Sequence, residues 1–127
     1  MVTTTKVGQL SEECNIWRNS LRSFREHLTT NKALLRQVAG RQTLRDDLLE
    51  IEHFDNQFHI HLINIHDLKQ AIKHHDRKAL AERISSNSAI SDETLARHEK
   101  LYEEYLSLQT ALHVVSGNFT KFMEHIR

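Results

Sequence analysis

Proline is missing from this sequence of 127 residues, and glycine and cysteine are scarce, with three and one respectively. Proline and glycine mark the turns between short elements, so their scarcity excludes many-stranded β folds and collagen-like or low-complexity chains. The single cysteine, Cys14, excludes an internal disulfide and favours a reducing compartment.

An excess of charge of one sign is missing too, because 17 basic side chains balance 17 acidic ones. A net charge of zero gives no overall attraction to nucleic acid or to an anionic membrane. No stretch approaches the roughly 18 apolar residues of a membrane span, and residues 1–7 lack the apolar core of a signal peptide. We therefore expect one cytoplasmic domain over residues 1–127, with no membrane partner and no nucleic acid.

Apolar residues recur at alternating steps of three and four along three long stretches, which is typical of helices packed as in coiled coils. The stripe of the middle stretch consists of Leu44, Leu48, Ile51, Asp55, Phe58, Leu62, Ile65, Lys69 and Ile72. The stripe of the first stretch runs from Leu10 through Cys14 and Trp17, and that of the last from Leu101 to Ile126. The fold class is therefore all-α.

These stripes predict helices over about residues 11–39, 42–75 and 92–126. Asp76 can cap a new helix, so we expect a break near residues 74–77 and allow a short fourth helix near 77–84. Short connections make consecutive helices antiparallel neighbours. The prediction is an elongated up-down antiparallel bundle of three long helices.

The second predicted helix carries apolar residues on the side away from its stripe, namely Leu49, Ile60 and Ile63. Two apolar sides suit a helix that is covered twice. The second cover is either the short fourth segment or another copy of the chain, and we expect a homo-oligomer through this patch.

Histidine is abundant, with ten residues in all and six of them between positions 53 and 75. A helical metal site commonly uses two histidines four residues apart, or two Glu-x-x-His motifs. The sequence has no such histidine pair and only one such motif, from Glu50 to His53. We therefore expect no metal or other cofactor, with a ferritin-like metal-binding bundle as an alternative.

Asp55 stands in the predicted apolar stripe, where a lone carboxylate is costly and needs a partner. Folding the first two helices back to back places His27 level with Asp55, and His113 comes to a similar level on the third helix. We expect a buried polar layer of His27, Asp55 and His113 that fixes the helix register. The alternative for these residues is a metal site that also includes His59.

The histidine-rich stretch between positions 53 and 75 also contains the short motif His66-Asp67-Leu68-Lys69. It resembles the phosphoacceptor motif of histidine-phosphotransfer domains and of the dimerising helix of sensor histidine kinases, although the glycine or proline of those families does not follow. The resemblance implies that His66 accepts a phosphoryl group, that Asp67 orients it and that Lys69 balances the phosphate charge.

The sequence contains no Gly-rich phosphate loop, nucleophile elbow or paired-cysteine motif, so we expect no enzyme and no catalytic residues. The leading hypothesis is a non-catalytic module that acts through protein–protein contact. Histidine phosphotransfer at His66 and metal binding by the bundle are the alternatives.

Overall fold

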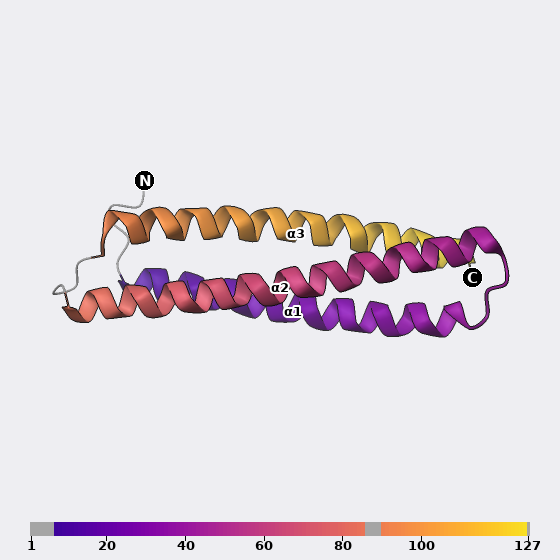
Figure 1. The fold of residues 1–127 in the computed structure, drawn as a ribbon, viewed down its shortest axis with the longest axis horizontal. Helices are drawn as coiled ribbons and strands as arrows, with labels where there is room; N and C mark the ends of the chain where they lie inside the picture. Colours follow the sequence, from indigo (N-terminus) through magenta and orange to yellow (C-terminus); the bar gives the residue numbers. More distant parts are fainter. Residues whose placement is uncertain (1–6, 86–89, 127) are drawn as a thin grey trace.

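The structure, a computed structural model, describes residues 7–85 and 90–126 as three long helices joined by short connections. They are α1 (Val7–Ala39), α2 (Arg45–Ser85) and α3 (Asp92–Ile126). Figure 1 shows α1 and α3 running in one direction along the long axis and α2 in the opposite direction, as the sequence predicts for an antiparallel all-α bundle. Residues 1–6, on which the expectation about a signal peptide mainly rests, lie outside the described residues.

The predicted break after residue 75 is wrong, because α2 continues as one helix of 41 residues to Ser85. Asp76 lies inside the helix and caps nothing, and residues 77–84 form no separate fourth helix. The continuation has a packing reason: Ile72, His75 and Ala79 are all buried at helical spacing. Without glycine or proline in this segment, nothing interrupts the backbone hydrogen bonds.

The apolar stripe of α2 also differs from the predicted one. Phe54 and Leu68 are buried, whereas their neighbours Asp55 and Lys69 lie beside the stripe and are half-exposed. Phe54 therefore takes the place in the stripe that was predicted for Asp55, and Leu68 takes the place predicted for Lys69, so the stripe is apolar at both positions. The carboxylate of Asp55 pairs with Lys32 of α1, with 4.0 Å between Nζ and Oδ1.

The predicted stripes of α1 and α3 form the rest of the core, with Phe24, Val38, Leu108 and Ile126 packed at its edge. At the end of the bundle where α2 begins, the core is aromatic: Phe58 is fully buried, with its ring centroid 5.1 Å from that of Phe119. Phe54 packs against Phe122 in the same group, at 5.3 Å.

A network of hydrogen bonds fixes the start of α3 against the end of α2. Ser91 caps α3, because its Oγ accepts a bond of 3.2 Å from the backbone N–H of Thr94. The carboxylate of Glu82 accepts the backbone N–H of Ser91 at 2.9 Å and the hydroxyl of Thr94. These bonds hold the pKa of Glu82 below its usual value.

The core stripe extends into this end of the bundle, where it becomes polar. Thr94 and His98 are the first buried residues of α3, and His75 is buried near the end of α2.

Within residues 7–85 and 90–126, no helix combines the length and the hydropathy that crossing a membrane needs.

Candidate functional site

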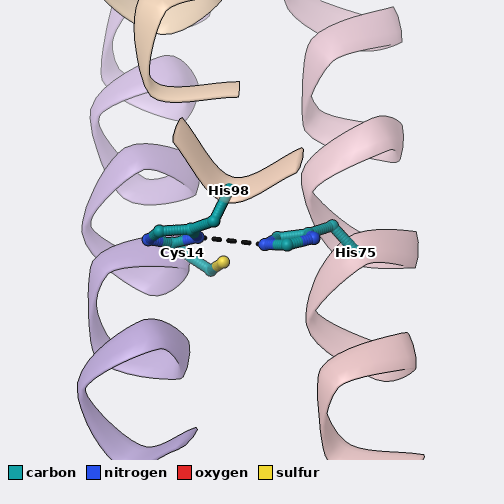
Figure 2. A group of neighbouring side chains, drawn as sticks. All are labelled: Cys14, His75 and His98. Carbon is teal, nitrogen blue, oxygen red and sulfur yellow. Dashed lines mark hydrogen bonds between the residues drawn. The ribbon is translucent and has the colours of Figure 1, made fainter. Parts of the chain in front are cut away.

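The polar end of the core brings one thiol and two imidazoles together from three helices. Cys14 comes from α1, His75 from α2 and His98 from α3, and their exposed fractions are 0, 4 and 3 %. Each offers a ligand atom within 4.8 Å of those of the other two. Figure 2 shows the three side chains pointing toward one another across the bundle axis. We call Cys14, His75 and His98 the Cys–His–His cluster.

Two hydrogen bonds fix the orientation of His98. Its Nε2 lies 2.7 Å from Oε1 of Glu13, and its Nδ1 lies 2.9 Å from Nε2 of His75, the bond drawn dashed in Figure 2. A carboxylate only accepts, so the ring N–H of His98 is at Nε2 and its Nδ1 carries a lone pair. Nε2 of His75 is then the donor between the two rings.

Aromatic packing closes the cluster on one side. The ring of Trp17 stacks on His98 with 4.7 Å between centroids, and also stacks on Tyr102 and Tyr105 at 5.6 and 6.0 Å. A large apolar ring against His98 limits the access of water and restricts the rotamer of the imidazole.

Burial keeps Cys14 and His75 in their neutral forms. It raises the pKa of the Cys14 thiol to about 12, with help from the negative charges of Asp76 and Glu13. It also lowers the pKa of His75 to about 4, with help from the neighbouring His98 and Arg97. Each effect follows from the cost of a charge in a low dielectric. At neutral pH the cluster therefore holds a thiol and an imidazole of His75 without charge.

Two buried polar atoms of α2, Nδ1 of His75 and Oδ1 of Asp76, have no hydrogen-bond partner among the described residues. Buried polar atoms in folded proteins nearly always have a partner, so each exception requires an explanation. Both exceptions belong to consecutive residues of α2 beside a thiol and a second imidazole.

The ligand types fit a transition-metal ion. Thiolate sulfur and imidazole nitrogen are the ligands that Zn²⁺ takes in proteins, at about 2.3 and 2.0 Å, which places tetrahedral ligand atoms roughly 3.3 to 3.7 Å apart. The two imidazole nitrogens, 2.9 Å apart, would have to separate by about 0.4 Å, and the other ligand distances, which lie within 4.8 Å, would have to shorten by up to about 1 Å to reach that geometry. The bond from His98 to Glu13 matches the carboxylate–histidine–metal arrangement that orients metal-ligating histidines.

The expected buried polar layer does not form, because His27 and His113 are exposed and Asp55 pairs with Lys32. His27 hydrogen-bonds Ser116 at 3.1 Å, and the ring of His113 lies edge-on to Phe24 at 5.8 Å. A half-exposed carboxylate beside the stripe needs no buried partner. His59, the fourth residue of the alternative metal site, is exposed on α2.

The phosphoacceptor-like motif lies on the surface of α2, where His66 and Asp67 are exposed. Lys69 is half-buried, and its pKa is lowered by burial and by nearby arginines of α1, Arg25 and Arg22 foremost. Phosphotransfer at His66 stays a prediction, since no observed contact of these residues favours it.

The predicted oligomer patch lies on the outer face of α2. Leu49, Ile60 and Ile63 have exposed fractions of 53, 54 and 47 %. Because α2 is continuous, no fourth helix within residues 7–85 and 90–126 covers them.

The Cys–His–His cluster was missed by the sequence reasoning, although a signal for it exists. Cys14 stands in the predicted stripe of the first helix. His75 follows Ile72 by three residues, and His98 precedes Leu101 by three, so each continues its stripe by one step. Ending the second stripe at a supposed break removed His75, and starting the third at Leu101 removed His98.

Comparison of the chain with protein-family models, with curated proteins and with solved structures finds no match to any of them. The function therefore has to be inferred from the residues of the site itself.

Proposed function

We propose that the protein is a non-catalytic helical bundle that binds a transition-metal ion, zinc foremost, through the thiolate of Cys14 and the imidazoles of His75 and His98. The observation that carries this proposal is the convergence of the three ligand types from three helices at a buried place. It replaces the expectation of a metal-free bundle, and it uses other residues than the ferritin-like alternative.

The ligand chemistry favours zinc over hard cations. Ca²⁺ and Mg²⁺ take oxygen ligands, whereas a thiolate with two imidazoles suits zinc and copper. The ordinary tautomer of His98 is already the binding one, because its N–H faces Glu13 and its lone pair faces the cluster. His75 has to move its proton from Nε2 to Nδ1, which changes no charge.

Zinc binding also requires that the Cys14 thiol lose its proton. With a pKa of about 12 the thiol is protonated at neutral pH, so each bound zinc ion releases one proton to the solvent. The charge of the ion reverses the local preference, since a coordinated thiol is deprotonated outright. Binding then links α1, α2 and α3 through a single ion, which is a structural rather than a catalytic role.

The test compares histidines that are adjacent in the sequence but different in burial. Untagged protein is stripped with a chelator and titrated with Zn²⁺ against a chromophoric competitor. We expect one tight site per chain, a loss of at least tenfold in affinity for His75→Gln, and no change for His74→Gln, because His74 is exposed on the surface of α2. Cys14→Ser should weaken binding as His75→Gln does.

Equal affinities of the wild type, His75→Gln and Cys14→Ser would contradict the proposal. That result would assign the zinc to exposed histidines, of which the chain has several. Circular dichroism of each variant distinguishes lost ligands from lost folding.

A second candidate function is self-association through the outer face of α2, which three half-exposed apolar residues favour. The partner is a second copy of this chain, because the patch suits a two-fold crossing of two α2 helices. A two-fold axis near Asn56 would place Leu49 of one chain against Ile63 of the other, with the helices crossing at that point.

Sedimentation tests this candidate at tens of micromolar protein. We expect a dimer for the wild type and a monomer for Ile60→Glu. The matched control is Val114→Glu on α3, where the side chain is similarly exposed at 58 % but lies outside the patch. A monomeric wild type, or equal dissociation by both variants, would exclude the interface.

A further inference from the structure

We propose that the groove between the end of α2 and the beginning of α3 binds a small molecule that carries a phosphate monoester. The groove has a volume of about 640 Å³, and its walls come from residues 71–78 of α2 and 93–100 of α3. Pockets for small molecules have volumes of roughly 300 to 1,000 Å³. The inference goes beyond the proposed function, because it assigns a second ligand that does not need the metal ion.

The walls of this groove carry an excess of positive charge. Apart from two histidines, their ionisable side chains are Lys78 on α2 and Glu93, Arg97 and Lys100 on α3. Lys78 and Glu93 pair across the groove, with 3.7 Å between Nζ and Oε1. Arg97 and Lys100 form no ion pair with any of the described residues. The groove therefore presents two positive charges that this part of the chain does not neutralise.

The two free cations lie next to each other on α3. Residues three apart on a helix are neighbours on its surface, so the side chains of Arg97 and Lys100 reach the same stretch of the groove. A second cavity between α2 and α3 has the opposite character, because its charged lining residues are Asp67 and Glu104. Of these two cavities, the one at the end of the bundle is therefore the one that attracts an anion.

The groove also has room beside the charges. Ala71 of α2 and Ala96 of α3 are among its lining residues, and their short side chains leave space that longer ones would fill. His75, which is 4 % exposed, adds an imidazole without charge to the wall. A bare inorganic ion occupies a small part of such a volume, so the groove suits an anion attached to a small organic group.

A phosphate monoester matches both the charge and the room. It carries about −1.5 to −2 charges at pH 7, which balances the two free cations, whereas a carboxylate carries one. The guanidinium of an arginine donates two parallel N–H bonds to phosphate oxygens, and the ammonium of a lysine adds a compact positive charge. The organic group of the ester then lies against the short side chains and the ring of His75.

The test is a titration of the chelator-treated full chain, followed by the chemical shifts of its backbone amides at about 0.1 M salt, which screens weak attraction to the surface. The probes are glycerol 3-phosphate and glycerol, which lacks the charge. We expect saturable shifts centred on residues 71–78 and 93–100 with glycerol 3-phosphate, and none with glycerol. Arg97→Gln and Lys100→Gln should each weaken binding by about tenfold, the lower end of what a hydrogen bond to a charged group contributes. Lys121→Gln, exposed on the same helix outside the groove, should match the wild type.

A further variant separates the groove from its charges. Ala96→Leu fills space in the groove and leaves the charge unchanged, so it should weaken the binding of glycerol 3-phosphate more than that of inorganic phosphate. Shifts that do not saturate, or that centre elsewhere, would overturn the inference, and so would binding that Arg97→Gln and Lys100→Gln leave unchanged. Equal affinities of Ala96→Leu and the wild type for glycerol 3-phosphate would also overturn it. The zinc proposal is unaffected by each of these results, because its own test uses variants of Cys14 and His75.

Discussion

Replacing Glu13 tests whether the carboxylate behind His98 serves the metal ion. The bond between Oε1 of Glu13 and Nε2 of His98 is 2.7 Å long, which is the range of a charge-assisted hydrogen bond. Glu13→Gln keeps an oxygen that accepts this N–H but removes the negative charge. Glu13→Ala removes both the acceptor and the charge.

The expected magnitudes follow from that difference. Loss of an outer-shell partner of a metal-ligating histidine typically lowers metal affinity 10- to 100-fold, or about 1.4 to 2.7 kcal/mol. Because Glu13 is 38 % exposed, solvent screens part of its charge. We therefore expect Glu13→Gln to lower zinc affinity about tenfold and Glu13→Ala to lower it by close to 100-fold.

The assay is the competition titration with Zn²⁺, and the adjacent residue provides the control. Glu12 is exposed on α1, so Glu12→Gln should leave the affinity unchanged. The dissociation constant for zinc should be the same for the wild type and Glu12→Gln, higher for Glu13→Gln and highest for Glu13→Ala. Equal constants for Glu12→Gln and Glu13→Ala would refute the outer-shell role.

Three further predictions concern stability. Free zinc at 100 times its dissociation constant should stabilise the fold by about 2.7 kcal/mol, which raises the Tm of a chain of 127 residues by about 10 °C; calorimetry showing no shift would contradict it. The free energy of unfolding of the metal-free protein should fall by up to about 3 kcal/mol as the pH falls from 6.5 to 4. The pKa of His75 is about 4 in the folded state and 6.5 in the unfolded state, so only the unfolded chain takes up that proton in this pH range. Urea unfolding of the chelator-treated protein checks this, and a stability independent of pH would refute it. Phe58→Ala should lower the free energy of unfolding by about 3 to 5 kcal/mol in the same urea assay, because Phe58 is fully buried, and a loss below about 1 kcal/mol would contradict the packing. Its zinc affinity should stay unchanged, because Phe58 lies about 25 Å along α2 from His75.

The fold could be predicted because it depends on a periodic pattern. The stripes of α1 and α3 are apolar at nearly every step, and nothing in the sequence competes with them. In α2 two neighbouring positions compete for the stripe, such as Phe54 and Asp55. Burial of the aromatic ring decides the register, and the carboxylate turns toward Lys32. The expected buried layer does not form because Asp55 lies beside the stripe and because His27 and His113 are exposed.

The site could not be predicted because its members are far apart in sequence and belong to no spacing motif. Cys14, His75 and His98 meet only when the helices pack in one register, with α2 unbroken beyond residue 75. Metal motifs on one helix have a fixed spacing, whereas a site with one ligand from each helix has none. The abundance of exposed histidines on α2 hid the buried one.

X-ray absorption at the zinc edge of the loaded protein tests the metal site most directly. The Cys–His–His cluster predicts one sulfur neighbour at about 2.3 Å and two imidazole nitrogen neighbours at about 2.0 to 2.1 Å, with the scattering of two rings. Cys14→Ser should remove the sulfur signal. A zinc ion surrounded by nitrogen and oxygen alone in the wild type would contradict the account.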